Sequence, residues 1–220
     1  TGGVVASIVI RTGAGNSGSP FNSAINLKAD SSLTLYAAGY DANGNYLAEV
    51  AATWDTLGAL SGGLSNFNDS VSTSILYEPT LVGSDKIDAV FGAFSYQTGQ
   101  ITVVAGDTAR PVIETGRNGS AEHLSSSKAA DDTLTLYAAG YDADGNFTGL
   151  IKAQSWSLSG GIGSITPSAQ SDSTVLTVNT TGNGTLRADY NGLTDNSGLI
   201  TATGGVVASI VIRTGAGNSG

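Results

Sequence analysis

The sequence contains two copies of a loop with oxygen-bearing side chains at alternate positions, "YDANGN" at 40–45 and "YDADGN" at 141–146. Carboxylate and amide oxygens in this pattern begin many calcium loops. The continuation of an EF-hand is missing, because Tyr46 stands where a glycine belongs and Ala52 where a bidentate glutamate belongs. We predict plain hairpin turns, which Asn-Gly and Asp-Gly favour, and no cofactor. The alternative is a calcium site completed by ligands from another loop or from the neighbouring domain. The candidate ligands are Asp41, Asn43, Asn45, Asp142, Asp144 and Asn146.

No other group of side chains has the pattern of a catalytic centre. The single histidine, His123, lies in a polar connecting segment without a serine, cysteine or metal-ligand pattern around it. We predict that it is a solvated loop residue and that the chain is not an enzyme.

Composition excludes several classes of partner. The net charge is −9, and the nine Lys and Arg residues are scattered singly, so no basic patch is available for nucleic acid. No run of eighteen apolar residues exists to enter a membrane. The chain holds no cysteine, which excludes a disulfide scaffold and fits an extracellular, cell-surface protein.

The chain is periodic at two levels. Residues 1–18, "TGGVVASIVIRTGAGNSG", return unchanged as residues 203–220, which gives a period of 202 residues. Within that period, "LTLYAAGYDANGN" at 33–45 returns as "LTLYAAGYDADGN" at 134–146, an offset of 101 residues. We therefore predict a domain A at 1–104, a domain B at 105–204, and the first strand of the next repeat at 205–220, in a window from a longer array.

The sequence of each unit predicts a series of short strands separated by turns. This pattern predicts an all-β fold of tandem immunoglobulin-like β-sandwich domains of about 100 residues each. In "LTLYAAGY" the residues alternate, and we place the leucine face inward. The polar stretches 22–32 and 120–132 are the candidates for a short turn of helix. The predicted strands of unit A cover 4–12, 33–40, 47–54, 72–77, 86–94 and 100–104.

These landmarks resemble the bacterial immunoglobulin-like domains that occur in tandem in adhesins of the invasin and intimin type. The resemblance rests on the strand leading into "YDANGN", the tryptophan strand "AATW" or "AQSWSLSGGIGSI", and the closing strand "TGQITVVAG" or "SGLITATGG". It implies a cell-surface location and a sandwich core without the antibody disulfide. Trp54 and Trp156 are then expected to pack against aliphatic side chains alone.

Two features suggest contacts between copies of the repeat, and they are our interface candidates. Tyrosines recur on the outer face of the second strand, where they provide either amphipathic cover or contact area. The apolar segment "VVASIVI" at 206–212 must pair, either as the first strand of the next domain or by addition to a neighbouring chain. The candidates are Tyr36, Tyr40, Tyr137, Tyr141, Val206, Val207, Ile210 and Ile212.

The sequence therefore predicts a structural repeat of a long bacterial surface protein, whose domains stack end to end into a rod or filament. Its partners are neighbouring copies of the same repeat. Two alternatives remain: an adhesin module that binds a host receptor or glycan, and accessory domains of a surface glycosidase.

Overall fold

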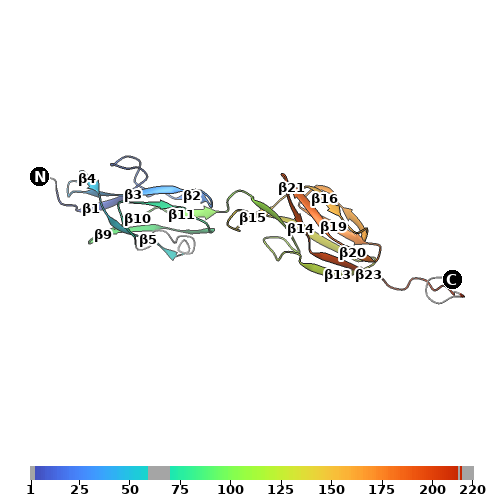
Figure 1. Cartoon of the computed structure of the whole chain (residues 1–220). Helices are drawn as coiled ribbons and strands as arrows, with labels where there is room; N and C mark the ends of the chain where they lie inside the picture. The colour runs from blue at the N-terminus through green and yellow to red at the C-terminus, as the bar shows by residue number, and fades with distance from the viewer. Residues whose placement is uncertain (1–2, 59–69, 213, 215–220) are drawn as a thin grey trace. The chain divides into compact units, whose positions relative to one another are not determined.

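The computed structural model describes residues 3–58, 70–212 and 214, and every regular element in these ranges is a β-strand (Figure 1). The all-β prediction is confirmed. No helix of the described residues is long and apolar enough to cross a membrane. The chain divides into two compact units, the first comprising Thr1–Ala109 with Tyr141–Thr148 and the second Arg110–Gly140 with Gly149–Gly220.

The strands of the first half are short and follow one another closely. They are β1 (Ser7–Arg11), β2 (Ile25–Lys28), β3 (Leu33–Tyr40), β4 (Tyr46–Glu49), β5 (Ala52–Thr56), β6 (Ser70–Ser72), β7 (Ser74–Tyr77), β8 (Gly83–Asp85), β9 (Ile87–Phe91), β10 (Phe94–Gln97) and β11 (Ile101–Val104).

The second half has a similar order, with one strand more than the described residues of the first half. Its strands are β12 (Arg110–Glu114), β13 (Ser125–Ala129), β14 (Thr133–Tyr141), β15 (Phe147–Leu150), β16 (Ala153–Leu158), β17 (Gly163–Thr166), β18 (Ala169–Ser171), β19 (Ser173–Val178), β20 (Gly182–Gly184), β21 (Leu186–Tyr190), β22 (Leu193–Asn196) and β23 (Leu199–Thr203).

Strand pairing gives each half the order of an immunoglobulin-like sandwich. In the first, β1 and β7 both pair with β3, while β9 lies between β5 and β10. In the second, β12 and β19 both pair with β14, while β21 lies between β16 and β22. These groupings correspond to strands A, B, E and C, F, G of the immunoglobulin fold.

A smaller sheet closes each half through a parallel pair. Strand β11 pairs with β2 in parallel, from Ile101 opposite Ile25 to Val104 opposite Lys28. Strand β23 pairs with β13 in the same way, from Ser125 opposite Leu199. The segments 22–32 and 120–132 therefore contain strands, and the expectation of a helical turn there was wrong. Their pairing partners lie more than 70 residues later, so local sequence does not reveal them.

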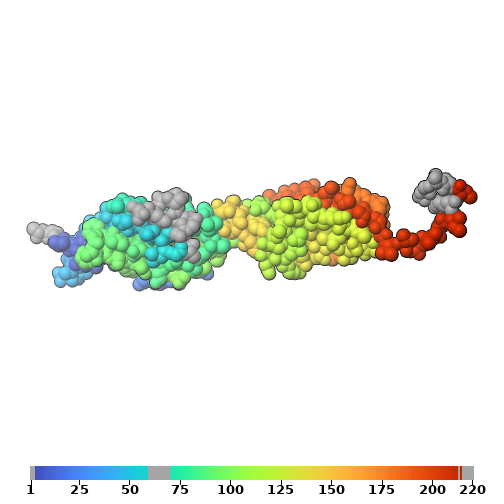
Figure 2. All heavy atoms as spheres, turned by 90° about the horizontal axis from the view of Figure 1, so that it is seen from below, coloured from blue at the N-terminus to red at the C-terminus, as the bar shows by residue number. Residues whose placement is uncertain are grey.

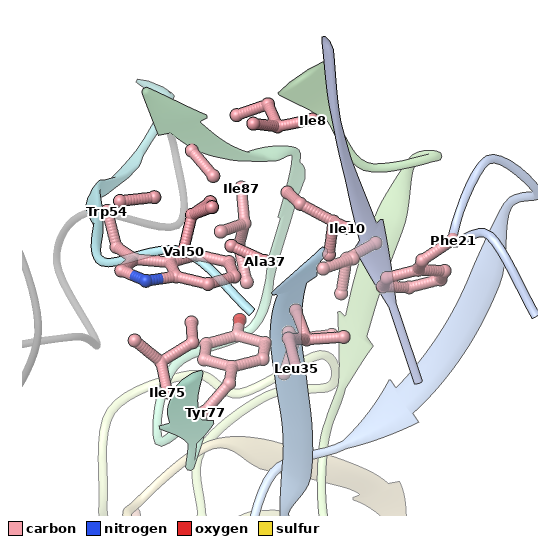
Figure 3. Packing of buried hydrophobic residues seen from close by; sticks show 14 of the residues in the cluster. Ile8, Ile10, Phe21, Leu35, Ala37, Val50, Trp54, Ile75, Tyr77 and Ile87 are labelled. Atoms are coloured by element: carbon pink, nitrogen blue, oxygen red, sulfur yellow. The ribbon is translucent and has the colours of Figure 1, made fainter. Parts of the chain in front are cut away.

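Each half has its own hydrophobic core. In the first, Leu35 and Ala37 of β3 are fully buried, which confirms that the leucine face points inward. Trp54 lies in this core with the aromatic residues Phe21 and Tyr77 among its members, so its surroundings are not aliphatic alone (Figure 3). In the second, the buried members of the core other than Trp156 are aliphatic, and the partly buried Tyr190 packs against them.

Several predicted strands are divided in the structure. The predicted strand 47–54 is split into β4 and β5, because the chain passes from one sheet to the other at Val50 and Ala51. The predicted strand 86–94 covers β9 and the first residue of β10, which form a hairpin with Gly92 at a φ of 60°. The first predicted strand begins three residues later than expected, at Ser7.

Candidate functional site

The first Asp-to-Asn loop is closed by hydrogen bonds among its own residues. Asp41 Oδ1 accepts from the backbone N–H groups of Asn43 and Asn45, both at 2.9 Å, and Asn45 Nδ2 donates to Asp41 Oδ2 at 3.0 Å. These hydrogen bonds stabilise the carboxylate and lower the pKa of Asp41. The bond from the Asn45 side chain has the largest effect, and the bond from the Asn45 backbone has the next largest. Gly44 takes a φ of 81°, which confirms the predicted tight turn.

The second loop has the same internal bonds and further partners. Asp142 Oδ1 accepts from Asn146 N at 2.7 Å, while Asp142 Oδ2 accepts from Asn146 Nδ2 and from Gly106 N, both at 2.8 Å. The amide of Asn146 also donates to Thr80 O at 2.8 Å. Burial raises the pKa of Asp142, but the bonds from Asn146 and Gly106 outweigh it and lower the pKa overall.

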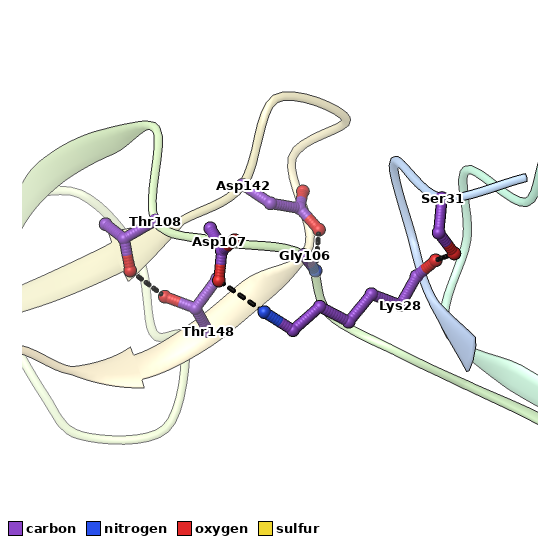
Figure 4. A network of polar contacts seen from close by, with 7 residues as sticks. All are labelled: Lys28, Ser31, Gly106, Asp107, Thr108, Asp142 and Thr148. Atoms are coloured by element: carbon purple, nitrogen blue, oxygen red, sulfur yellow. Dashed lines mark hydrogen bonds and ion pairs between the residues drawn. The ribbon is translucent and has the colours of Figure 1, made fainter. Parts of the chain in front are cut away.

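The polar network around this loop belongs to the first unit (Figure 4). Lys28 Nζ pairs with Asp107 Oδ1 at 2.5 Å, and the hydroxyls of Thr108 and Thr148 bond to each other at 2.7 Å. The Lys28 to Asp107 pair is exposed on both sides, so it contributes little to stability. Asp142, by contrast, is 1% exposed and accepts three hydrogen bonds.

Four of the six candidate calcium ligands, Asp41, Asn45, Asp142 and Asn146, use their side chains to close the loops. The oxygens of Asp41 and Asp142 accept N–H donors from their own loops, and Asn43 and Asp144 are exposed. Within the described ranges, no three or more His, Cys, Asp or Glu side chains gather in a way that could hold a metal ion. A polar hollow beside the second loop is lined by Asp30, Glu78 and Asp144 among others. Burial, followed by the hydrogen bond shared with Asp144 and repulsion from its charge, raises the pKa of Asp30.

Removing the Asp142 carboxylate is expected to lower the free energy of unfolding by about 1–3 kcal/mol, because Asp142→Ala leaves the Gly106 and Asn146 donors without an acceptor. Since the folded-state pKa of Asp142 is lowered, this stabilisation is present above pH about 4 and disappears as the pH falls through the folded pKa. Urea unfolding at several pH values measures both effects. Asn43→Ala, at the exposed position of the first loop, is the control and should change little.

The four candidate tyrosines are half-buried, and three have ring or hydroxyl partners within their own units. Arg11 Nη1 donates to the Tyr40 hydroxyl at 3.1 Å. The Arg117 guanidinium lies 5.0 Å from the ring centre of Tyr137, and the rings of Tyr141 and Phe147 meet edge to face at 5.8 Å. These contacts orient three of the four side chains, and all four residues stay partly exposed.

The apolar segment near the C-terminus extends away from the packed body of the second unit (Figure 2). Residues 204–212 form no strand there. The exposed fractions are 94% for Val206, 77% for Val207, 89% for Ile210 and 97% for Ile212. The structure therefore presents these four candidates without a strand partner among the described residues.

His123 is 2% exposed, so the prediction of a solvated loop residue was wrong. Its backbone N–H donates to Ile113 O at 2.9 Å, just as the N–H of Phe21 donates to Ile10 O at 2.8 Å. His123 therefore occupies in the second half the place that Phe21 fills in the first. Aligning the two halves from the Thr-Gly pairs at 12–13 and 115–116, an offset of 103 residues, places Leu124 opposite Phe21, so the sequence alone does not reveal this equivalence.

Replacing His123 by phenylalanine is expected to remove an acid sensitivity from the second unit. Burial lowers the pKa of His123, so the unfolded chain binds this proton more readily than the folded chain does. The free energy of unfolding therefore falls as the pH drops below about 6.5 and levels off below the folded pKa. Thermal unfolding of His123→Phe between pH 7 and 5 should lack this fall.

The reciprocal substitution is the control for this effect. Phe21→His should introduce the same fall in stability into the first unit, because Phe21 is 4% exposed at the equivalent place. An unchanged pH profile in both variants would contradict the assignment.

A hydroxyl followed by glycine closes each half in the same way. Ile87 N donates to the Thr98 hydroxyl at 2.9 Å, and Leu186 N donates to the Ser197 hydroxyl at 2.9 Å. The glycine that follows each hydroxyl residue donates its backbone N–H to a distant carbonyl. Gly99 N donates to Phe21 O at 2.9 Å, and Gly198 N donates to His123 O at 2.6 Å. The sequence showed "TG" and "SG" as matching landmarks but not what they do.

The fold of the chain is similar to folds found in bacterial surface proteins. The Escherichia coli adhesin FdeC has 19% identity and a TM-score of 0.41, with 81% of this chain and 62% of that chain covered. The S-layer protein rSbsC has 16% identity and a TM-score of 0.38, with 94% and 29% covered. The Yersinia pseudotuberculosis adhesin InvE has 15% identity and a TM-score of 0.32, with 81% and 56% covered.

This chain therefore spans less than two thirds of the length of each of these three structures. No family model matches the chain, and no match was found among the curated proteins. The likeness concerns the fold alone.

Proposed function

We propose that this chain is a structural, non-enzymatic repeat segment of a long bacterial surface or extracellular protein, built from immunoglobulin-like domains of the invasin and intimin type. Domains A (1–104) and B (105–204) stack end to end, and residues 205–220 begin the next domain A. The number of stacked domains determines the length of the resulting rod or filament, and the outer faces of the domains form its surface.

One observation carries this proposal, the matching spacing after the two closing strands. Strand β11 ends at Val104 and β12 begins at Arg110, so five residues, 105–109, connect them. Strand β23 ends at Thr203, and five residues, 204–208, separate it from Ser209, whose copy Ser7 begins β1. The chain thus leaves domain B with the spacing by which it leaves domain A, which supports continuous stacking.

A length series tests the stacking. Strands of about eight residues at roughly 3.3 Å per residue span about 26 Å, and loops bring one domain to about 40 Å. Chains with one, two and three copies of residues 1–202 should therefore lengthen by about 80 Å per copy. Small-angle X-ray scattering gives the maximum dimension, and electron micrographs show whether the particles are linear. A dimension that does not grow with copy number would overturn the proposal.

The half-buried tyrosines are the proposed lateral contacts between parallel rods. Tyr36→Ser combined with Tyr137→Ser should leave the circular dichroism spectrum unchanged and weaken self-association in sedimentation velocity. Thr34→Ser with Thr135→Ser, at exposed positions on the same face of β3 and β14, is the matched control. Unchanged self-association in the tyrosine variant would exclude these rings as contacts.

A further inference from the structure

The first unit places two carboxylates directly opposite each other on one of its sheets. In the antiparallel pair of β5 and β9, Asp55 lies opposite Asp88, next to the buried pair of Trp54 and Ala89. Successive residues of a strand point to opposite faces, so both carboxylates lie on the outer face of this sheet. Directly opposite residues have their Cβ atoms about 5 Å apart, and like charges at this distance destabilise the pairing of the strands.

The surroundings of this carboxylate pair, Asp55 and Asp88, do not neutralise its charge. Asp88 Oδ1 is shielded from solvent and has no hydrogen-bond partner among the described residues. On the other side of β9, strand β10 presents the uncharged Gln97 opposite Asp88. Lys86, two residues before Asp88, takes part in none of the ion pairs found in the described part of the chain. Asp85, at the end of β8, carries a charge of the same sign as the pair.

The second unit has different residues at the equivalent place. Trp156 lies opposite Ala188, so the next pair, Ser157 opposite Arg187, corresponds to the carboxylate pair of the first unit. Arg187 is positively charged, and its Nε donates to Asp189 Oδ1 at 2.8 Å. The two halves therefore share the strand register, but the first has two carboxylates face to face where the second has a hydroxyl and a guanidinium.

We propose that the carboxylate pair is an acid-sensitive switch that sets how firmly β5 and β9 are paired. At neutral pH both carboxylates are ionised and repel each other across the two strands. When the pH falls, Asp88 binds one proton from the solvent, and its O–H then donates to the Asp55 carboxylate, so a hydrogen bond replaces the repulsion. This switch acts within the first unit and does not depend on the proposed stacking of domains.

The direction of the effect follows from the surroundings of Asp88 in the folded chain. Burial, followed by repulsion from Asp55, raises the pKa of Asp88, and the backbone N–H of Ala89 lowers it by less. The folded chain therefore binds this proton more readily than the unfolded chain, in which the pKa of an aspartate is about 3.9. The contribution to the free energy of unfolding rises as the pH falls through the folded pKa and is complete below about 3.9. Its sign is opposite to that of the His123 effect in the second unit.

Asp88→Asn tests the switch, because it removes one charge at every pH and keeps a donor for Asp55. In a Trp156→Phe background, Trp54 remains as the fluorescent reporter next to Asp55 in the chain. At pH 7 the variant should lower the equilibrium constant of unfolding in urea by about two- to fivefold, and at pH 4 this difference should disappear. Asp55→Asn should behave alike, and the double variant should gain no more than either single variant, since each change alone removes the repulsion. A gain that persists at pH 4, or two gains that add in full, overturns the proposal.

An added carboxylate on β10 gives the reciprocal test. Gln97→Glu places a third carboxylate directly opposite Asp88, so it should lower the stability of the first unit at pH 7 and enlarge the recovery at pH 4. Ser95→Glu is the matched control for added charge, because Ser95 is exposed on the same face of β10 but lies opposite Val90. Its effect should be the smaller of the two. Equal effects of the two substitutions would show a response to net charge alone and contradict the switch.

Discussion

Gly198→Ala is expected to destabilise the second unit by about 3 kcal/mol, the upper end of the usual cost of overpacking. A Cβ at Gly198 would come within 1.5 Å of the backbone oxygen of Leu124, and backbone cannot move aside as a side chain can. The same shift would break the 2.6 Å bond from Gly198 N to His123 O. Chemical denaturation followed by Trp156 fluorescence, in a Trp54→Phe background that leaves Trp156 as the remaining tryptophan, measures the loss.

Gly99→Ala tests the same closure in the first unit. Its Cβ would lie 2.1 Å from Ser23 O, so a similar loss should appear in the transition that Trp54 reports in a Trp156→Phe background. Gly204→Ala is the neutral control, because a Cβ there has no atom within 4 Å. If Gly198→Ala lowers the free energy of unfolding no more than Gly204→Ala does, the close approach of the Gly198 and Leu124 backbones is wrong.

Trp54→Ala should remove about 3–5 kcal/mol from the free energy of unfolding of the first unit. Trp54 is fully buried, and its indole Nε1 donates to Ser72 O at 2.8 Å, so the change creates a cavity and leaves a carbonyl without its donor. The two units have separate cores. Trp156, the remaining tryptophan, should therefore report an unchanged transition for the second unit while circular dichroism shows the first unit unfolding earlier.

Trp156→Ala gives the reciprocal result, because Trp156 is 3% exposed and its Nε1 donates to Ser171 O at 3.1 Å. Val71→Ala, at a position 67% exposed, is the surface control and should cost less than about 0.5 kcal/mol. A Trp54→Ala variant whose second unit loses the same amount of stability would show that the two units unfold as one.

Local pattern was sufficient to predict much of the fold. The alternation in 33–40 indicated which face of β3 is buried, since successive side chains of a strand point to opposite faces. Asn-Gly and Asp-Gly identified both hairpin turns, because Gly44 and Gly145 supply the positive φ that the turns need. The repeat of 101 residues indicated two similar halves.

Local pattern was insufficient wherever a residue's partner is distant in sequence. Strands β2 and β13 were missed because each is completed by a closing strand more than 70 residues later. The candidate calcium residues were found, but their sequence did not reveal that Asp142 accepts from Gly106, 36 residues before it. A hydrogen bond of this kind depends on how the chain is brought together.

The sequence alone determined that this protein is an all-β repeat, that its hairpins turn at Asn-Gly and Asp-Gly, and that its first strand has a second copy. Those properties follow from the alternation of side chains, the conformational freedom of glycine and the sequence identity of the repeats. Each can be recognised without knowing which distant segments come into contact. Only the tertiary structure decided that His123 is buried in the place of a phenylalanine and that Gly198 meets the backbone of Leu124. Burial and close approach are properties of two segments together, so neither segment encodes them by itself.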